Sequence, residues 1–160
     1  METKLKKVKK HGFWDYLIAL ILALLVIIMF TQVFFRYVLN HSLSWSEELT
    51  KYLFVWLVFL GGALCLRDKT HIGVDFFISL LPDFFKPGIR IFNYLLITIF
   101  SILVTILGFM WVIKVHGTYT PALGWPLNLV FYAAVAVGFL LTSIYAVRHL
   151  ISEFKQEEED

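Results

Sequence analysis

The stretch SLSWSEELTKYLFVWLVFLGGALCLRD, from Ser42 to Asp68, decides how this chain folds. Its uncharged apolar run at residues 52–66 has 15 residues and would make a helix of roughly 22 Å. The hydrocarbon core of a bilayer is about 30 Å thick. A helix that crosses it must therefore include the preceding turn, which carries Glu47, Glu48 and Lys51.

The composition of the chain is that of a membrane protein. Hydrophobic residues make up 59% of its 160 residues and charged residues only 16%, whereas about a quarter of the residues in a soluble domain are charged. The single cysteine, Cys65, lies inside an apolar run, so no disulfide can form within the chain.

Three further uncharged runs are long enough to cross a bilayer as helices. They are Tyr16–Phe35, Phe92–Ile113 and Leu127–Val147. Together with the segment that begins at the charged turn, they predict an all-α integral membrane protein with four transmembrane helices.

The predicted organisation is a basic tail at residues 1–12, a four-helix transmembrane domain at 13–150 and an acidic tail at 151–160. The first run is too long for the apolar region of a cleaved signal peptide, and no small-residue cleavage site follows it. We therefore expect this run to be retained as an anchor.

Lysine and arginine are distributed unevenly around the four spans. One side of the membrane receives 11 of them, from the two tails and the segment between the second and third spans. The other side receives 3, namely Arg36, Lys51 and Lys114. Because cytoplasmic segments carry the excess of positive charge, both termini are expected in the cytoplasm.

The segment Val74–Phe85 is too short to span the membrane, but it has an amphipathic pattern. Asp75, Ser79 and Asp83 recur every four residues among Phe and Leu. If helical, this segment suits a helix that lies in the cytoplasmic interface; the alternative is an ordinary connecting loop.

The basic and polar residues just before that segment are candidates for contacts at the cytoplasmic interface. Arg67 and His71, together with Asp75, would lie beside the interfacial helix and could hold lipid phosphates or a partner. The alternative is that these residues only anchor the chain by the positive-inside rule.

The charged turn before the second span has a local explanation. Ser44 and Glu47 have the spacing of a capping box, and Glu47 precedes Lys51 by four residues, the favoured order for a helical ion pair. The alternative is that the turn meets a partner. Arg36 ends the first span at the same level and could pair with Glu47 or Glu48.

Along one face of the second helix the side chains become smaller, from Glu47 and Lys51 to Gly62. Another helix could approach closely at Gly62. Trp45 lies where an outer aromatic belt is expected. Together with Arg36, Glu48 and the rest of the charged turn, these residues are the candidates for a partner interface or a structural role.

The chain lacks the usual signatures of enzymes and self-sufficient carriers. No ionisable residue lies in the middle of a span, where proton- or ion-coupled carriers place them. No metalloprotease, hydrolase or Cys/His cluster motif occurs. We therefore expect no enzyme activity, no cofactor and no nucleic-acid partner. The class of function that remains is an accessory or scaffold subunit.

The segment FFRYVLNHSLSWSEELTKYLFVWLVFLGGALCLRDKTHIGVD, residues 34–75, resembles the small membrane subunit of tripartite ATP-independent periplasmic (TRAP) transporters. The resemblance is carried by an Arg that ends the first span, a Trp two residues before Glu-Glu, the FVWLVFLG core and R-x-x-x-H-I-G-V-D. TPALGWP, residues 120–126, resembles the family's outer loop. One departure is Lys51, where the family pattern predicts Arg.

The resemblance implies a subunit in the bacterial inner membrane that braces a much larger membrane subunit and helps to dock an extracytoplasmic substrate-binding protein. The large subunit would carry the substrate and sodium sites, and this chain would contact it and membrane lipids. Family substrates are organic anions such as C4-dicarboxylates and sialic acid, and the chain leans toward the sialic-acid branch. The alternative is a free-standing small four-helix exporter or membrane scaffold protein.

Overall fold

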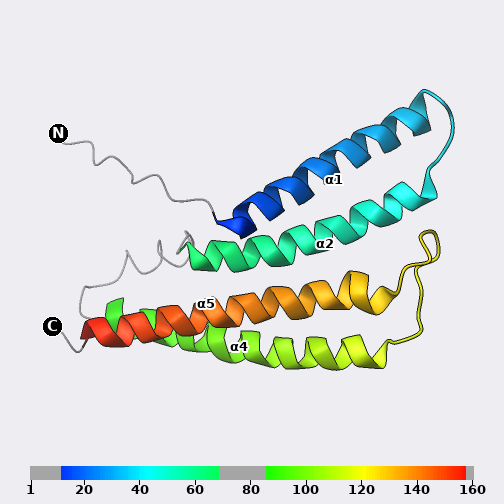
Figure 1. Cartoon of the computed structure of the whole chain (residues 1–160). Helices are drawn as coiled ribbons and strands as arrows, with labels where there is room; N and C mark the ends of the chain where they lie inside the picture. Colours follow the sequence, from blue (N-terminus) through cyan, green and yellow to red (C-terminus); the bar gives the residue numbers. More distant parts are fainter. Residues whose placement is uncertain (1–11, 69–85, 158–160) are drawn as a thin grey trace, which may run out of the picture.

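A computed structural model of the chain describes residues 12–68 and 86–157. Helices account for most of this part (Figure 1). They are α1 (Phe13–Tyr37), α2 (Ser44–Arg67), α4 (Lys86–Lys114), the π-helical turn η2 (Asn128–Tyr132) and α5 (Ala133–Glu157). Outside helices and turns, these residues show one isolated β-bridge, between Tyr119 and Pro126. The predicted all-α class is therefore confirmed.

The helices form an open row rather than a closed bundle (Figure 1). α1 packs on α2, α2 on α5, and α5 on α4; within the described residues α1 contacts neither α4 nor α5. The α1–α2 and α4–α5 connections lie at one end of the row, here called the hairpin end. The opposite end, here called the termini end, holds the start of α1 and the ends of α2 and α5.

Four helical segments are long and apolar enough to cross a membrane, which confirms a multi-pass membrane protein. They are Phe13–Tyr37, Ser44–Arg67, Gly88–Lys114 and Asn128–Glu153. The second has 24 residues and includes the charged turn, as its short apolar run requires. α5 continues to Glu157, into the segment expected as an acidic tail.

Two glycines set the closest approaches between the helices. A Cβ at Gly138 on α5 would lie 2.5 Å from the Cβ of Phe59 on α2, and a Cβ at Gly108 on α4 would lie 3.2 Å from the Cβ of Ala136 on α5. A Cβ at Gly62 would meet nothing within 4 Å. Among the described residues, the close helix contact is therefore made at Gly138 and not at Gly62.

The fourth span begins with the π-helical turn, which the sequence pattern did not predict. Within it the N–H of Ala133 bonds to the carbonyl of Asn128, five residues earlier. The indole N–H of Trp56 on α2 donates to the carbonyl of Val130 at 2.9 Å. This bond joins α2 to the turn inside the membrane, where an unsatisfied backbone carbonyl is costly.

Candidate functional site

The start of α2 differs from the predicted capping box. The N-cap residue is Leu43, its side chain makes no cap, and Ser44 is already helical. The hydroxyl of Ser46 instead donates to the carbonyl of Leu43 at 2.7 Å. The capping box of Ser44 and Glu47 is therefore wrong, because the helix starts one residue earlier than that pattern requires.

Glu48 is a buried carboxylate with three hydrogen bonds. Its Oε2 accepts the backbone N–H groups of Ala122 and Leu123, both at 2.8 Å, and its Oε1 accepts the hydroxyl of Tyr52 at 3.2 Å. The residue is 7% exposed. Since consecutive backbone N–H groups form a small anion-binding concavity, the α4–α5 loop supplies the partner that the sequence left open for this acid.

Glu47 points to a different neighbour. Its Oε1 lies 3.9 Å from Nη1 of Arg36, which joins the end of α1 to the start of α2 as the sequence suggested. The Arg36 and Glu47 side chains are 60% and 42% exposed. An exposed pair of this length contributes about 0–1 kcal/mol, so it orients α1 weakly at the hairpin end.

A groove lies beside these two acids at the hairpin end. Its volume is about 580 Å³, and it runs between α2 and the α4–α5 loop. It is lined by Ser44, Glu47, Glu48, Lys51, Tyr52, Pro121 and Ala122. Lys51 is exposed, and Trp45 on the same turn is 44% exposed. Glu47, Glu48 and Lys51 thus line one groove.

At the termini end, Arg67 forms an ion pair that the sequence analysis did not identify. Its Nη2 lies 2.6 Å from Oδ1 of Asp15 on α1, and its Nε lies 2.8 Å from Oδ1 of Asp68. Asp15 also accepts the N–H of Gly12 at 2.7 Å, which caps α1. Arg67 therefore joins the start of α1 to the end of α2, in addition to any contact with lipid or a partner.

A histidine ties α5 to the same end of α2. Nε2 of His149 lies 3.0 Å from the carbonyl oxygen of Leu66, so this nitrogen is the donor. Leu66 is among the last four residues of α2, whose carbonyls have no partner within the helix. The His149 ring also stacks on Tyr94 of α4 at 5.6 Å between ring centroids.

The other residues predicted for the cytoplasmic interface, His71 and Asp75, lie outside the described residues, as does the proposed interfacial helix at 74–85.

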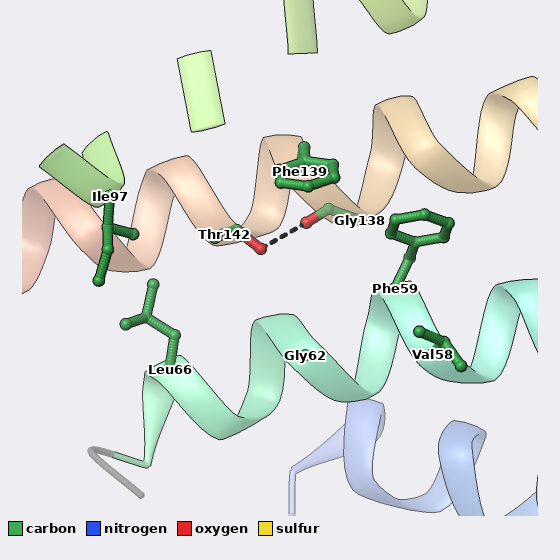
Figure 2. A pocket seen from close by; sticks show the side chains of 8 residues that line it. All are labelled: Val58, Phe59, Gly62, Leu66, Ile97, Gly138, Phe139 and Thr142. Carbon is green, nitrogen blue, oxygen red and sulfur yellow. Dashed lines mark hydrogen bonds between the residues drawn. The ribbon is translucent and has the colours of Figure 1, made fainter. Parts of the chain in front are cut away.

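A second, apolar groove crosses the middle of the row (Figure 2). Its volume is about 220 Å³. Figure 2 shows Phe59 and Leu66 reaching from α2 toward α5 on either side of Gly62, with the Thr142 hydroxyl bonded to the Gly138 carbonyl. Gly62 is exposed along this groove. Its predicted role as a contact for a partner helix stays a prediction.

The sequence analysis missed Asp15, Trp56 and His149. Asp15 had a local signal, since an acid three residues after a helix N-cap is typical of capping. Trp56 and His149 had none, because each donates to a carbonyl more than 70 positions away in the chain.

Comparison with known proteins places these features in a family. The profile for tripartite ATP-independent periplasmic transporters, DctQ component, matches residues 25–156. A relative from Haemophilus influenzae that bears the name of a TRAP transporter small permease protein is 30% identical over 134 residues, 84% of this chain and 83% of the relative. The ectoine TRAP transporter small permease protein TeaB of Halomonas elongata is 32% identical over 150 residues, 84% and 74% respectively.

A third relative is a longer protein. The sialic acid TRAP transporter permease protein SiaT of Haemophilus influenzae is 36% identical over 70 residues. The match covers 44% of this chain but 11% of SiaT. The similarity is therefore confined to a small part of that protein.

Proposed function

The chain belongs to the DctQ component family of TRAP transporters and is a small permease subunit, and we propose that it braces the large transport subunit and helps to dock the substrate-binding protein. The family is one of transporter subunits and not of enzymes. The large subunit would carry the substrate and the sodium ions that drive transport.

The observation that carries the bracing role is the set of hydrogen bonds that hold α2 against the last part of the chain, from the α4–α5 loop to α5. They lie at three levels: Glu48 binds the loop near the hairpin end, Trp56 binds η2 in the middle, and His149 of α5 binds the end of α2. Gly138 and Phe59 also bring the two helices into direct contact. Such a contact suits a rigid support, because each bond satisfies a backbone group that lipid cannot satisfy.

The open row of helices is evidence for a large membrane partner. A single layer of helices leaves both of its faces apolar and uncovered by this chain, and in α1 only Leu25 is buried. One relative with similarity to this chain is a permease protein in which the matching part is 11% of the length. Both observations favour a large membrane subunit, although lipid covers part of these faces.

The proposed orientation places the termini end in the cytoplasm and the hairpin end outside, in a bacterial inner membrane. It follows from the excess of lysine and arginine in the tails and between the second and third spans. In this orientation the groove at Glu47 and Lys51 faces the binding protein, and Arg67 faces the cytoplasm.

The proposed substrate is an organic anion, with sialic acid as the first candidate. Names of similar proteins include both ectoine and sialic acid transporters, so family membership leaves the substrate open. The large subunit and the binding protein, rather than this chain, would select it.

Reconstituted transport tests this function. The large subunit is purified with and without this chain and placed in proteoliposomes with the binding protein and a sodium gradient. We expect stable co-purification, and uptake of labelled sialic acid only when all three proteins are present. Uptake that proceeds equally well without this chain would overturn the bracing and docking roles, and a panel of other carboxylates tests the substrate separately.

A further inference from the structure

The loop between α4 and α5 is folded by its own hydrogen bonds. The N–H of Thr120 donates to the carbonyl of Trp125 at 2.8 Å, and the N–H of Leu127 donates to the carbonyl of Thr118 at 2.9 Å. The Thr120 hydroxyl accepts the N–H of Trp125 at 2.9 Å. Gly124 has a φ of +66°, which favours glycine. Residues 118–127 therefore form a preformed hairpin.

Glu48 fixes this hairpin to α2. One carboxylate oxygen binds the N–H groups of both Ala122 and Leu123, so the tip of the hairpin is held at two adjacent amides. Loss of the acceptor would remove the bonds that hold both N–H groups, and with them the tip of the hairpin, to α2. The position of the hairpin relative to the groove thus depends on Glu48.

The charges left exposed at this end are mostly positive. Arg36, Lys51 and Lys114 are all exposed there. Of the two carboxylates, Glu48 is buried under the hairpin, and only Glu47 remains partly exposed. Three exposed cations thus face one exposed acid, and this region presents a surplus of positive charge.

Large aromatic side chains flank the same surface. Tyr119 and Trp125 on the hairpin are 64% and 46% exposed, and Trp45 on α2 is 44% exposed. Tyrosine and tryptophan are enriched at protein interfaces and at the water boundary of membranes. An acidic partner that binds at this end would therefore also meet exposed aromatic side chains.

We propose that the hairpin and its groove receive an acidic surface of the extracytoplasmic binding protein, and that Glu48 is the positioning residue that holds the hairpin ready. Lys51 lines the groove and makes the charged contact, and Arg36 and Lys114, exposed at the same end of the row, add to the long-range attraction. This inference rests on the proposed docking function and names the surface and chemistry that carry it out.

The test compares two neighbouring glutamates in the assembled transporter. Glu48→Met keeps length and helix propensity but removes the acceptor, and Glu47→Met is the matched control. Each complex of this chain with the large subunit is placed in nanodiscs, and its affinity for the labelled binding protein is measured, with hydrogen exchange at residues 118–127.

For Glu48→Met we expect faster exchange at Ala122 and Leu123 and an affinity for the binding protein lower by about tenfold, measured on complexes that contain equal amounts of the large subunit. Glu47→Met should leave exchange unaltered and should not weaken binding, because it removes the one exposed acid. Glu48→Gln should recover most of the affinity, since its carbonyl oxygen can still accept both amides.

Lys51→Gln tests the charged contact separately. Because the Lys51 side chain is exposed, the substitution should not disturb folding. It should weaken binding and reduce its dependence on salt, with normal hairpin exchange. The proposal is overturned if Glu48→Met frees the hairpin without weakening binding, or if Lys51→Gln changes neither affinity nor salt dependence. Failure of the unaltered complex to bind the binding protein would instead overturn the docking function itself.

Discussion

Asp15 and Arg67 join the first turn of α1 to the last turn of α2, with 2.6 Å between Oδ1 and Nη2. Both side chains are 22% exposed. The pair matters because α1 packs only on α2 and approaches it most closely at the termini end (Figure 1). Besides the packing of α1 on α2, the other ion pair between these two helices in the described residues is the more exposed Arg36–Glu47 pair.

Asp15→Asn should therefore loosen α1. The variant keeps the shape and can still accept the N–H of Gly12, but it loses the charge that Arg67 meets. We expect a lower unfolding temperature, because a charge-assisted hydrogen bond is replaced by a neutral one, measured by thermal unfolding in detergent. Arg36→Gln is the control, and we expect it to lower the unfolding temperature less. An equal decrease for both variants would contradict the stronger role of the Asp15–Arg67 pair.

The Arg36–Glu47 pair should be weak in the isolated chain. A double-mutant cycle with Arg36→Ala and Glu47→Ala should give a coupling of about 0–1 kcal/mol in unfolding. The same cycle on complex stability or transport tests a partner role. If both single variants are silent there, the pair only orients α1.

Gly138→Ala should separate α2 from α5. The added Cβ would lie 2.5 Å from the Cβ of Phe59 and 3.1 Å from its backbone, and neither can yield without movement of the helix. Overpacking of this kind costs about 1–3 kcal/mol. Gly62→Ala is the matched control, because its Cβ meets nothing within 4 Å. Equal unfolding temperatures for the two variants would refute the close contact.

Trp56→Phe should weaken the middle of the α2–α5 contact. The ring remains, but the carbonyl of Val130 loses its indole donor, at a cost of about 1 kcal/mol. Unfolding by denaturing detergent measures the loss. Trp45→Phe, at an exposed position, should be close to neutral, and a larger effect there than at Trp56 would count against this assignment.

Cysteine labelling tests the orientation. In a Cys65→Ser background, a membrane-impermeant thiol reagent applied from outside should label His41→Cys and Thr118→Cys at the hairpin end. Ser152→Cys at the termini end should react only after the membrane is opened. Outside labelling of Ser152→Cys in intact cells would reverse the topology.

The sequence by itself determined the four membrane-spanning helices, their approximate ends and the inclusion of the charged turn in the second span. Each of these follows from one segment alone, because a helix in lipid satisfies its own backbone and needs only length and apolarity. The pairing of Arg36 with Glu47 was also within reach, since a short loop of six residues joins their helices.

Only the tertiary structure decided which helices touch and where the polar groups find partners. The apolar runs do not determine the order α1, α2, α5, α4. Lipid and helix surfaces are equally apolar, so local packing contacts determine which helices are neighbours. The two glutamates show the consequence: they are adjacent in sequence, yet Glu47 turns to Arg36 and Glu48 is buried beneath the α4–α5 hairpin. A helix directs consecutive side chains to different sides, and only the packing determines what lies on each side.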